Sequence, residues 1–276
     1  MAEVRSVPQI RSCKVRRGDD PLVMLTAYDA PSGRIADAAG ADILLVGDSL
    51  AMVVLGYEDT LQVTVGDMVH HTAAVARTHP RALLVADLPW LSYHLSTEDT
   101  LRNGAALIRA GAGAVKLEGG RRRVPMVDAL IGAEIPVMGH LGLTPQSLHT
   151  MGGFKVQARE AGAIAQMIED AHALEAAGCF ALVLEGVPDL VAQKVTEALE
   201  VPTIGIGAGV HCDGQVLVFH DLLGLHPGVP AKFVRRYAEL ADAGVEAARS
   251  WAADVRSGTY PTDAESYHLP GGTPPP

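Results

Sequence analysis

The stretch ILLVGDS (residues 43–49) decides the fold, because it is a short apolar run that ends on a carboxylate at Asp48. Three further runs, ALLVADLP, AVKLEGG and ALVLEGV, end in the same way on Asp87, Glu118 and Glu185. Continuous apolar runs of this length are typical of strands buried on both faces of a parallel sheet. A buried carboxylate is costly unless it is paired or bound to a metal. The four endings therefore predict a shared site at the carboxyl ends of parallel strands, where α/β barrels and open α/β sheets place their chemistry.

Apolar runs recur along the whole chain. The expected strands are 22–27, 43–46, 82–86, 114–117, 136–138, 181–184, 202–206 and 217–219. Between most of them lie alanine-rich segments with helical periodicity, at 32–39, 67–77, 97–110, 124–132, 161–177 and 189–199. Strands that alternate with helices indicate βαβ units and a parallel sheet. The pattern favours an α/β fold of the closed (β/α)8 TIM-barrel type, with an open doubly wound sheet as the alternative.

The length and composition predict one cytoplasmic domain. The chain has 276 residues, which suits a single barrel of about 250 residues better than two domains. We expect a catalytic barrel with an N-terminal extension over residues 1–256, closed by one or two helices within 230–255. The Pro- and Gly-rich tail at 257–276 is expected to be mobile, at least beyond Leu269. The sequence shows neither an apolar run long enough to span a membrane nor the apolar core of a secretory signal.

Charge and cysteine content exclude several functions. The net charge of −10 argues against a nucleic-acid partner, which requires a basic surface. The three cysteines, Cys13, Cys179 and Cys212, lie far apart without a CxxC motif. This spacing indicates neither a disulfide framework nor a thiolate zinc site.

Asp48, Asp87 and Glu118 end three consecutive predicted strands and are the candidate metal ligands. Neighbouring strands lie about 5 Å apart, so three adjacent strand ends can direct carboxylates at one ion. Alone, each residue would be read as a helix cap or turn residue. Their clustering favours a site for a hard divalent cation such as Mg²⁺. Ser49, next to Asp48, is either a helix cap or a donor to a bound substrate.

The remaining candidate residues lie on the fourth, fifth and sixth strands. Lys116 precedes Glu118 by two residues, so both side chains face the barrel interior. An inward lysine is expected to pair with a carboxylate, to anchor an anionic substrate, or both. His140 is either a satisfied polar residue or a catalyst. Glu185, one strand away from the ion ligands, is the candidate general base, with a structural salt bridge as the alternative.

Three loops carry weaker signals. GIGAG (205–209) has the position of a phosphate-cradling loop, but glycine-rich turns are common. GGFKVQAR (152–159) either closes over the site or merely connects two elements. Gln146 and Ser147 either cap the following helix or line the cleft.

Several motifs together are specific: VGDSL, VTVGDMVHHTAAVAR, LVADLPW, GAVKLEGG, PVMGHLGLTPQS, GGFKVQAR and VPTIGIGAGVHCDGQVLVFHDLLGL. In this combination the chain resembles the ketopantoate hydroxymethyltransferase (3-methyl-2-oxobutanoate hydroxymethyltransferase) family over about residues 16–260. The resemblance implies a (β/α)8 barrel of the phosphoenolpyruvate/pyruvate superfamily type and a cytoplasmic homo-oligomer, usually a decamer. It further implies one Mg²⁺ per subunit and 5,10-methylenetetrahydrofolate as co-substrate.

The implied reaction transfers a hydroxymethyl group to 3-methyl-2-oxobutanoate through a Mg²⁺-stabilised enolate, giving 2-dehydropantoate for pantothenate and coenzyme A biosynthesis. By matching positions, the implied metal ligands are Asp48, Asp87 and Glu118, and the implied keto-acid-binding residues are Asp48, Ser49, Asp87 and Lys116. The resemblance makes Glu185 the proton acceptor and His140 an active-site histidine. A metal-dependent C–C lyase or aldol-type enzyme of the same superfamily is the alternative, and a non-catalytic keto-acid sensor is the second.

The chain departs from the family pattern at four positions where the family usually has Gly, Gly, Cys and Pro. These are Ala51, Ala158, Gly186 and Ala231. None of them removes a charged residue of the predicted site. Ala158 and Gly186 put the geometry of their loops in question.

Overall fold

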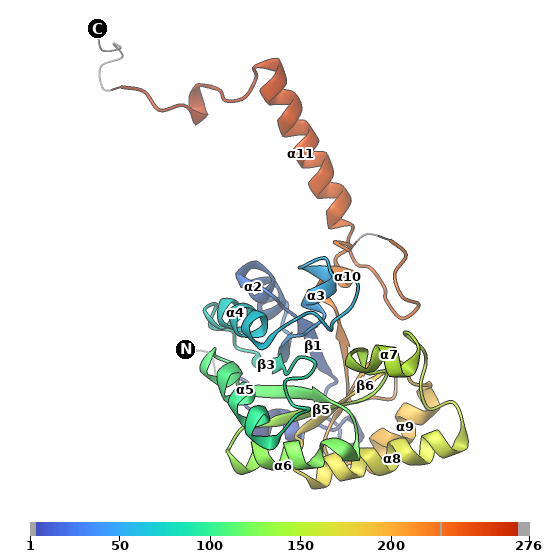
Figure 1. Ribbon diagram of the computed structural model, residues 1–276. Coiled ribbons are helices and arrows are strands. Elements are labelled where there is room, and N and C mark those ends of the chain that lie inside the picture. Colours follow the sequence, from blue (N-terminus) through green and yellow to red (C-terminus); the bar gives the residue numbers. More distant parts are fainter. Residues whose placement is uncertain (1–3, 227, 270–276) are drawn as a thin grey trace. The chain divides into compact units, whose positions relative to one another are not determined.

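A computed structural model describes residues 4–226 and 228–269. All strands are parallel and hydrogen-bond in chain order into a closed barrel, so the predicted (β/α)8 fold is confirmed (Figure 1). The strands are β1 (Leu22–Thr26), β2 (Ile43–Val46), β3 (Leu83–Asp87), β4 (Ala114–Glu118), β5 (Val137–Gly142), β6 (Ala181–Glu185), β7 (Thr203–Ile206) and β8 (Gly214–Leu217).

Helices follow most strands and surround the barrel. The longer ones are α2 (Ala30–Ala38), α4 (Val65–Ala76), α5 (Thr97–Arg109), α6 (Val124–Gly132), α8 (Ala161–Ala176) and α9 (Asp189–Ala198). Short helical segments are α1 (Val7–Ser12), α3 (Leu50–Val53), α7 (Leu148–Met151), α10 (Phe219–Leu222), η1 (Val15–Arg17), η2 (Arg121–Arg123) and η3 (Pro145–Ser147). Side chains that accept a backbone N–H start α2, α4 and α5, namely Asp29, Thr64 and Ser96. Such caps satisfy otherwise unpaired N–H groups of the first turn.

The eighth strand begins earlier than its apolar run predicts. We expected 217–219, whereas β8 pairs with β1 from Gly214 to Leu217. The apolar signal extends past the strand because Phe219, the first residue of α10, is also buried. Gly214 has no side chain and therefore does not extend the apolar run. It is nevertheless tightly packed in the sheet, because a Cβ there would lie 2.6 Å from the Leu22 carbonyl oxygen.

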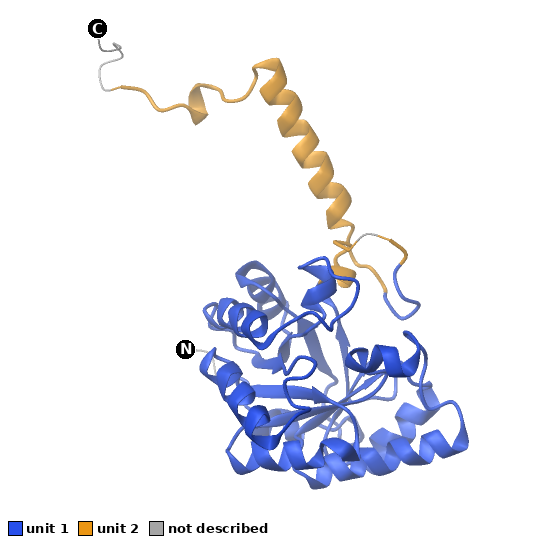
Figure 2. Cartoon of the chain, viewed as in Figure 1, with its two compact units in different colours: residues 1–219, 230–234 blue, residues 220–229, 235–276 orange. Residues whose placement is uncertain are grey.

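The chain divides into two compact units (Figure 2). The first, residues 1–219 and 230–234, contains all eight barrel strands. The second, residues 220–229 and 235–276, contains α11 (Leu240–Ser257) and η4 (Asp263–Glu265). Within the segment where one or two closing helices were predicted, α11 is the helix that forms. The expected mobility beyond Leu269 lies outside the described residues. No helix in the described part of the chain is long and apolar enough to cross a membrane.

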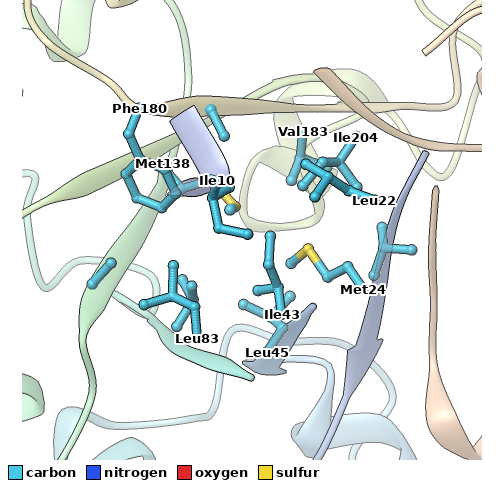
Figure 3. Packing of buried hydrophobic residues seen from close by; sticks show 14 of the residues in the cluster. Ile10, Leu22, Met24, Ile43, Leu45, Leu83, Met138, Phe180, Val183 and Ile204 are labelled. Carbon is cyan, nitrogen blue, oxygen red and sulfur yellow. The ribbon is translucent and has the colours of Figure 1, made fainter. Parts of the chain in front are cut away.

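The barrel interior is filled by alternate strand residues. Leu22 and Met24 of β1, Ile43 and Leu45 of β2, and their counterparts on the other strands form one buried cluster (Figure 3). Ile10 of α1 belongs to the same cluster and is completely buried. The N-terminal extension therefore contributes to the barrel core.

A buried ion pair that the sequence did not indicate fastens the N-terminal extension to the barrel. Lys14 Nζ lies 2.7 Å from Asp213 Oδ2, with both side chains buried. The same ammonium donates to the carbonyl oxygens of Thr196 at 2.9 Å and Val201 at 3.2 Å. Asp213 in turn accepts the backbone N–H of Thr203, at the start of β7. All three ammonium protons thus have acceptors, as a buried lysine requires.

Replacing Lys14 by Met should lower the free energy of unfolding by about 3–5 kcal/mol, because it leaves the Asp213 carboxylate buried without its cation. Urea denaturation followed by circular dichroism measures this change. The matched control is Arg16→Met, which breaks an exposed pair with Glu200 and should cost less than about 1 kcal/mol. Equal effects of the two substitutions would show that the Lys14 pair does not stabilise the fold.

Candidate active site

The polar residues at the carboxyl end of the barrel continue the inward rows of the apolar core. In β3, Val85 lies in the core and Asp87 follows two residues later. In β6, Val183 and Glu185 have the same relation. Because side chains alternate along a strand, Asp87 and Glu185 point into the barrel. Alternation therefore places these strand-end carboxylates on the inner face of the barrel.

Lys116 and Asp87 form a buried ion pair across neighbouring strands. The two residues are in register on β4 and β3, and Lys116 Nζ lies 3.1 Å from Asp87 Oδ1. Burial lowers the pKa of Lys116, but the charges of Asp87, Glu118 and Asp48 outweigh it and raise the pKa above its ordinary value. Lys116 is therefore a fixed positive charge inside the barrel. The predicted structural pairing is present in this structure.

His140 bridges two carboxylates. Its Nδ1 lies 3.2 Å from Glu118 Oε1, and its Nε2 lies 3.3 Å from Glu185 Oε2. Burial and the Lys116 charge lower the pKa of His140, but Glu118 and the hydrogen bonds to Glu118 and Glu185 together raise it to about 9. The Lys116 ammonium also lies 3.3 Å from His140 Nδ1. Burial acts to raise the pKa of Glu118, yet the charge of His140 beside it holds that pKa below its ordinary value.

Asp48 lies in the turn after β2 and has no cationic partner of its own. Its backbone N–H donates to Asp87 Oδ2 at 3.1 Å, and its Oδ2 accepts from Gln146 Nε2 at 2.8 Å. Burial, followed by the negative charges of Asp87 and Glu118, raises the pKa of Asp48 well above its ordinary value. Negative charge is thus in excess at this point of the barrel.

The donor chemistry of this cluster fits a hard divalent cation. Asp48, Asp87, Glu118 and Glu185 supply four carboxylates, whereas Lys116 and His140 are the two basic side chains that contact them. Carboxylates therefore outnumber basic groups, and oxygen ligands suit Mg²⁺. The carboxylates are nevertheless not gathered around one point, since no group of three His, Cys, Asp or Glu within residues 4–226 and 228–269 forms a metal cage. Both oxygens of Glu118 are engaged, Oε1 with His140 and Oε2 with the backbone N–H of Gln146.

Ser49 faces the site rather than capping a helix. It stands at the start of α3, but its side chain makes no capping hydrogen bond. Its Oγ lies 2.8 Å from the hydroxyl of Tyr28, a buried residue that sequence reasoning missed. The Tyr28 carbonyl in turn lies 2.6 Å from His71 Nδ1. The predicted role of Ser49 as a donor to substrate is therefore compatible with its geometry.

Two further residues form part of the site. Gln146, left open in the sequence between a helix cap and the cleft, is buried and contacts Asp48 and Glu118. Tyr93, which sequence reasoning missed, is buried beside it, with its hydroxyl 2.6 Å from Gln146 Oε1. Its place six residues after Asp87 in LVADLPWLSYH was the available signal. A loop tyrosine, however, has no periodicity that reveals its direction.

The two loops with weaker signals differ in what the structure shows. The 152–159 loop is tied to the strand end that carries Glu185, because Gln157 N donates to the Gly186 carbonyl oxygen at 2.8 Å. Within this loop Ala158 has a φ of 50°, a left-handed conformation that costs an L-residue about 1–2 kcal/mol. Gly186 has a φ of 55°, which glycine adopts without strain. In GIGAG, Gly207 makes room for Phe233, since a Cβ would lie 2.8 Å from its ring.

Comparisons with known proteins show the family of this chain. The family model described as ketopantoate hydroxymethyltransferase matches residues 5–263. The chain is 57% identical over 249 residues to "3-methyl-2-oxobutanoate hydroxymethyltransferase 2" of Bradyrhizobium diazoefficiens, covering 90% of this chain and 85% of that one. It is 53% identical over 272 residues to the 3-methyl-2-oxobutanoate hydroxymethyltransferase of Oleidesulfovibrio alaskensis, covering 98% and 93%.

Similar solved structures are more distant and bear on the fold alone. A phosphonopyruvate hydrolase, solved with oxalate and Mg²⁺, has a TM-score of 0.61 at 13% identity, with 96% of this chain and 92% of that chain covered. A 2,3-dimethylmalate lyase, described as a PEP mutase/isocitrate lyase superfamily member, has a TM-score of 0.59 at 19% identity over the same shares. These structures agree with the closed (β/α)8 barrel of this chain. By the family match and these relatives, the chain belongs to the ketopantoate hydroxymethyltransferase family of enzymes.

Proposed function

We propose that this protein transfers a hydroxymethyl group from 5,10-methylenetetrahydrofolate to 3-methyl-2-oxobutanoate, giving 2-dehydropantoate for pantothenate and coenzyme A biosynthesis. The observation that carries the proposal is the buried cluster in which Lys116 pairs with Asp87 while His140 bridges Glu118 and Glu185. It supplies a cation for an anionic keto acid and a carboxylate for proton abstraction. Relatives at 53% and 57% identity carry the name of this activity.

Lys116 and Ser49 are the proposed contacts to the keto acid. The Lys116 ammonium attracts the substrate carboxylate, and its pairing with Asp87 fixes the position of that charge. Ser49 supplies a hydroxyl whose orientation is set by Tyr28. Lys116 lies in β4 and Ser49 precedes α3, both at the carboxyl end of the barrel. The substrate is therefore proposed to bind at this end.

Glu185 is the proposed base for the C3 proton of the keto acid. Its side chain is 18% exposed, whereas those of His140 and Glu118 are each 3% exposed. Glu185 is therefore the reachable end of the cluster, and His140, whose Nε2 lies 3.3 Å from Glu185 Oε2, orients its carboxylate. Loss of the C3 proton leaves an enolate, whose carbon bonds to the one-carbon unit as one C–N bond of the folate breaks; the second C–N bond breaks as a water oxygen bonds to the same carbon, which releases tetrahydrofolate. One water supplies the new hydroxyl oxygen.

Asp48 and Asp87, with Glu118 as the third carboxylate, are the residues proposed to hold one Mg²⁺ per subunit. When bound, Mg²⁺ supplies Lewis-acid stabilisation of the negative charge that develops on the keto oxygen. The excess of carboxylates over cations in the cluster supports this assignment. Asp48 and Asp87 would also contact the bound keto acid.

We further propose a homo-oligomer in the cytoplasm, with a decamer as the state implied by the family resemblance. Helix α11 supports self-association, since it has no buried residue and exposes Trp251, Val245 and Val255. Exposed apolar side chains of this size are typical of surfaces that another chain covers.

The competing function is that of a metal-dependent lyase on the same barrel. The lyase and hydrolase structures that resemble this chain do so at 19% and 13% identity, which bears on the fold alone. A lyase would process its keto acid without folate. Mass spectrometry of 3-methyl-2-oxobutanoate incubated with Mg²⁺ should therefore show 2-dehydropantoate only when methylenetetrahydrofolate is present. Turnover of the keto acid without folate would favour the lyase instead.

Replacing Glu185 by Gln should abolish exchange of the C3 hydrogen with solvent. The amide keeps the size and hydrogen bonding of the side chain but cannot accept the proton, so the exchange rate should fall about 10²–10⁴-fold. NMR in D₂O, with enzyme, Mg²⁺ and keto acid, follows this proton directly. The exposed Glu98→Gln serves as the matched control and should exchange at the normal rate. Near-normal exchange in Glu185→Gln would exclude Glu185 as the base.

Replacing Lys116 by Met should weaken binding of the keto acid by about tenfold or more, because a charge-assisted contact worth at least about 1.5 kcal/mol is lost. Isothermal titration calorimetry of 3-methyl-2-oxobutanoate in the presence of Mg²⁺ measures the change. Lys194→Met, on the exposed face of α9, is the control. Unchanged affinity in a folded Lys116→Met protein would leave Lys116 with a structural role alone.

A further inference from the structure

A buried hydrogen-bond relay connects Tyr93 to Asp48 through the side chain of Gln146. The Tyr93 hydroxyl donates to Gln146 Oε1 at 2.6 Å. Gln146 Nε2 then donates to Asp48 Oδ2 at 2.8 Å and to the Leu88 carbonyl oxygen at 2.9 Å. Every side chain of this relay is buried, so no solvent competes for these bonds.

The relay admits only one orientation of the glutamine amide. The Tyr93 hydroxyl accepts the backbone N–H of Glu118 at 3.1 Å and has two acceptors for its own proton, of which Gln146 Oε1 at 2.6 Å is nearer than the Glu118 carbonyl oxygen at 3.3 Å. An oxygen of the amide must therefore face the phenol. The amide nitrogen must face Asp48 and Leu88, which present only acceptors at this point. Asp48 and Leu88 thus fix the amide nitrogen, and the phenol supplies the donor for the amide oxygen.

Tyr93 and Gln146 also contact Glu118. The backbone N–H of Gln146 donates to Glu118 Oε2 at 3.0 Å, and Tyr93 receives the backbone N–H of Glu118. The hydrogen bonds of Gln146 therefore connect the carboxyl ends of β2, β3 and β4, through Asp48, Leu88 and Glu118 respectively. Asp48 contributes only Oδ2 to these bonds, which leaves Oδ1 available.

We infer that Tyr93 and Gln146 are positioning residues for the cation site, which hold Asp48 and Glu118 at a fixed spacing and direct Asp48 Oδ1 toward the ion. The inference rests on the proposed function, since it assumes that these carboxylates bind Mg²⁺. Neither Tyr93 nor Gln146 touches the ion itself. Partners that orient metal ligands in this way commonly contribute a factor of about 10–100 in metal affinity.

The Tyr93 ring also lies against Arg123, whose guanidinium carbon is 5.4 Å from the ring centroid, and Tyr93→Phe keeps this ring.

The test is titration calorimetry of MgCl₂ into the full-length chain, with 3-methyl-2-oxobutanoate present, for wild type, Tyr93→Phe, Gln146→Met and the double variant. Each single variant should bind Mg²⁺ at least about tenfold more weakly. In the double variant the Tyr93 substitution should add much less than it does alone, because it acts mainly through Gln146. The controls Tyr267→Phe and Gln193→Met, which are remote from the relay, should bind Mg²⁺ with wild-type affinity, and thermal melts should show all variants folded.

Unchanged Mg²⁺ affinity in both single variants would overturn the inference, and so would two losses that multiply fully in the double variant. If Tyr93→Phe does not fold, Gln146→Met decides the question alone, by loss or retention of affinity. Absence of Mg²⁺ binding by the wild-type protein would instead contradict the proposed metal site, and the inference with it. The two failures are therefore distinguishable in one set of titrations.

Discussion

The structure depends on one constraint, which is the alternation of side chains in a closed barrel of short parallel strands. Alternation sends every second residue inward, and closure brings all inward rows to a common axis. At the amino ends these rows are apolar and form the core with Leu22, Met24 and Ile43. At the carboxyl ends the same rows deliver Asp87, Glu118 and Glu185, so carboxylates are forced together where water is scarce.

This crowding is costly for stability, and the cluster offsets it only in part. Lys116 compensates Asp87, and His140 lies between Glu118 and Glu185. Asp48 remains with hydrogen bonds but without a cation. A buried charge without a partner is normally selected against unless a ligand completes the site. The proposed divalent cation and anionic substrate together account for a cluster that the fold alone would not favour.

The barrel and the strand-end residues could be predicted because they depend on local periodicity. Period 2 in AVKLE places Lys116 and Glu118 on one face, and the structure confirms that both are buried in the barrel. The strand boundaries at β8 were less predictable, since Phe219 continues the apolar signal beyond Leu217. Residues whose role arises only from tertiary contacts were missed. Lys14 lies in the charged run KVRRGDD, which looks solvated, and Tyr93 lies in a loop, where no pattern fixes the direction of a side chain.

The central claim is that Asp48, Asp87 and Glu118 bind one divalent cation beside a keto acid held by Lys116. A crystal structure of the protein with Mn²⁺ in place of Mg²⁺ and with 3-methyl-2-oxobutanoate would test it most directly, because anomalous scattering locates manganese without ambiguity. The account predicts one anomalous peak per subunit within coordination distance of the three carboxylates, with the substrate carboxylate at Lys116 and its C3 facing Glu185. A peak elsewhere, or a keto acid bound away from Lys116 and Glu185, would contradict it.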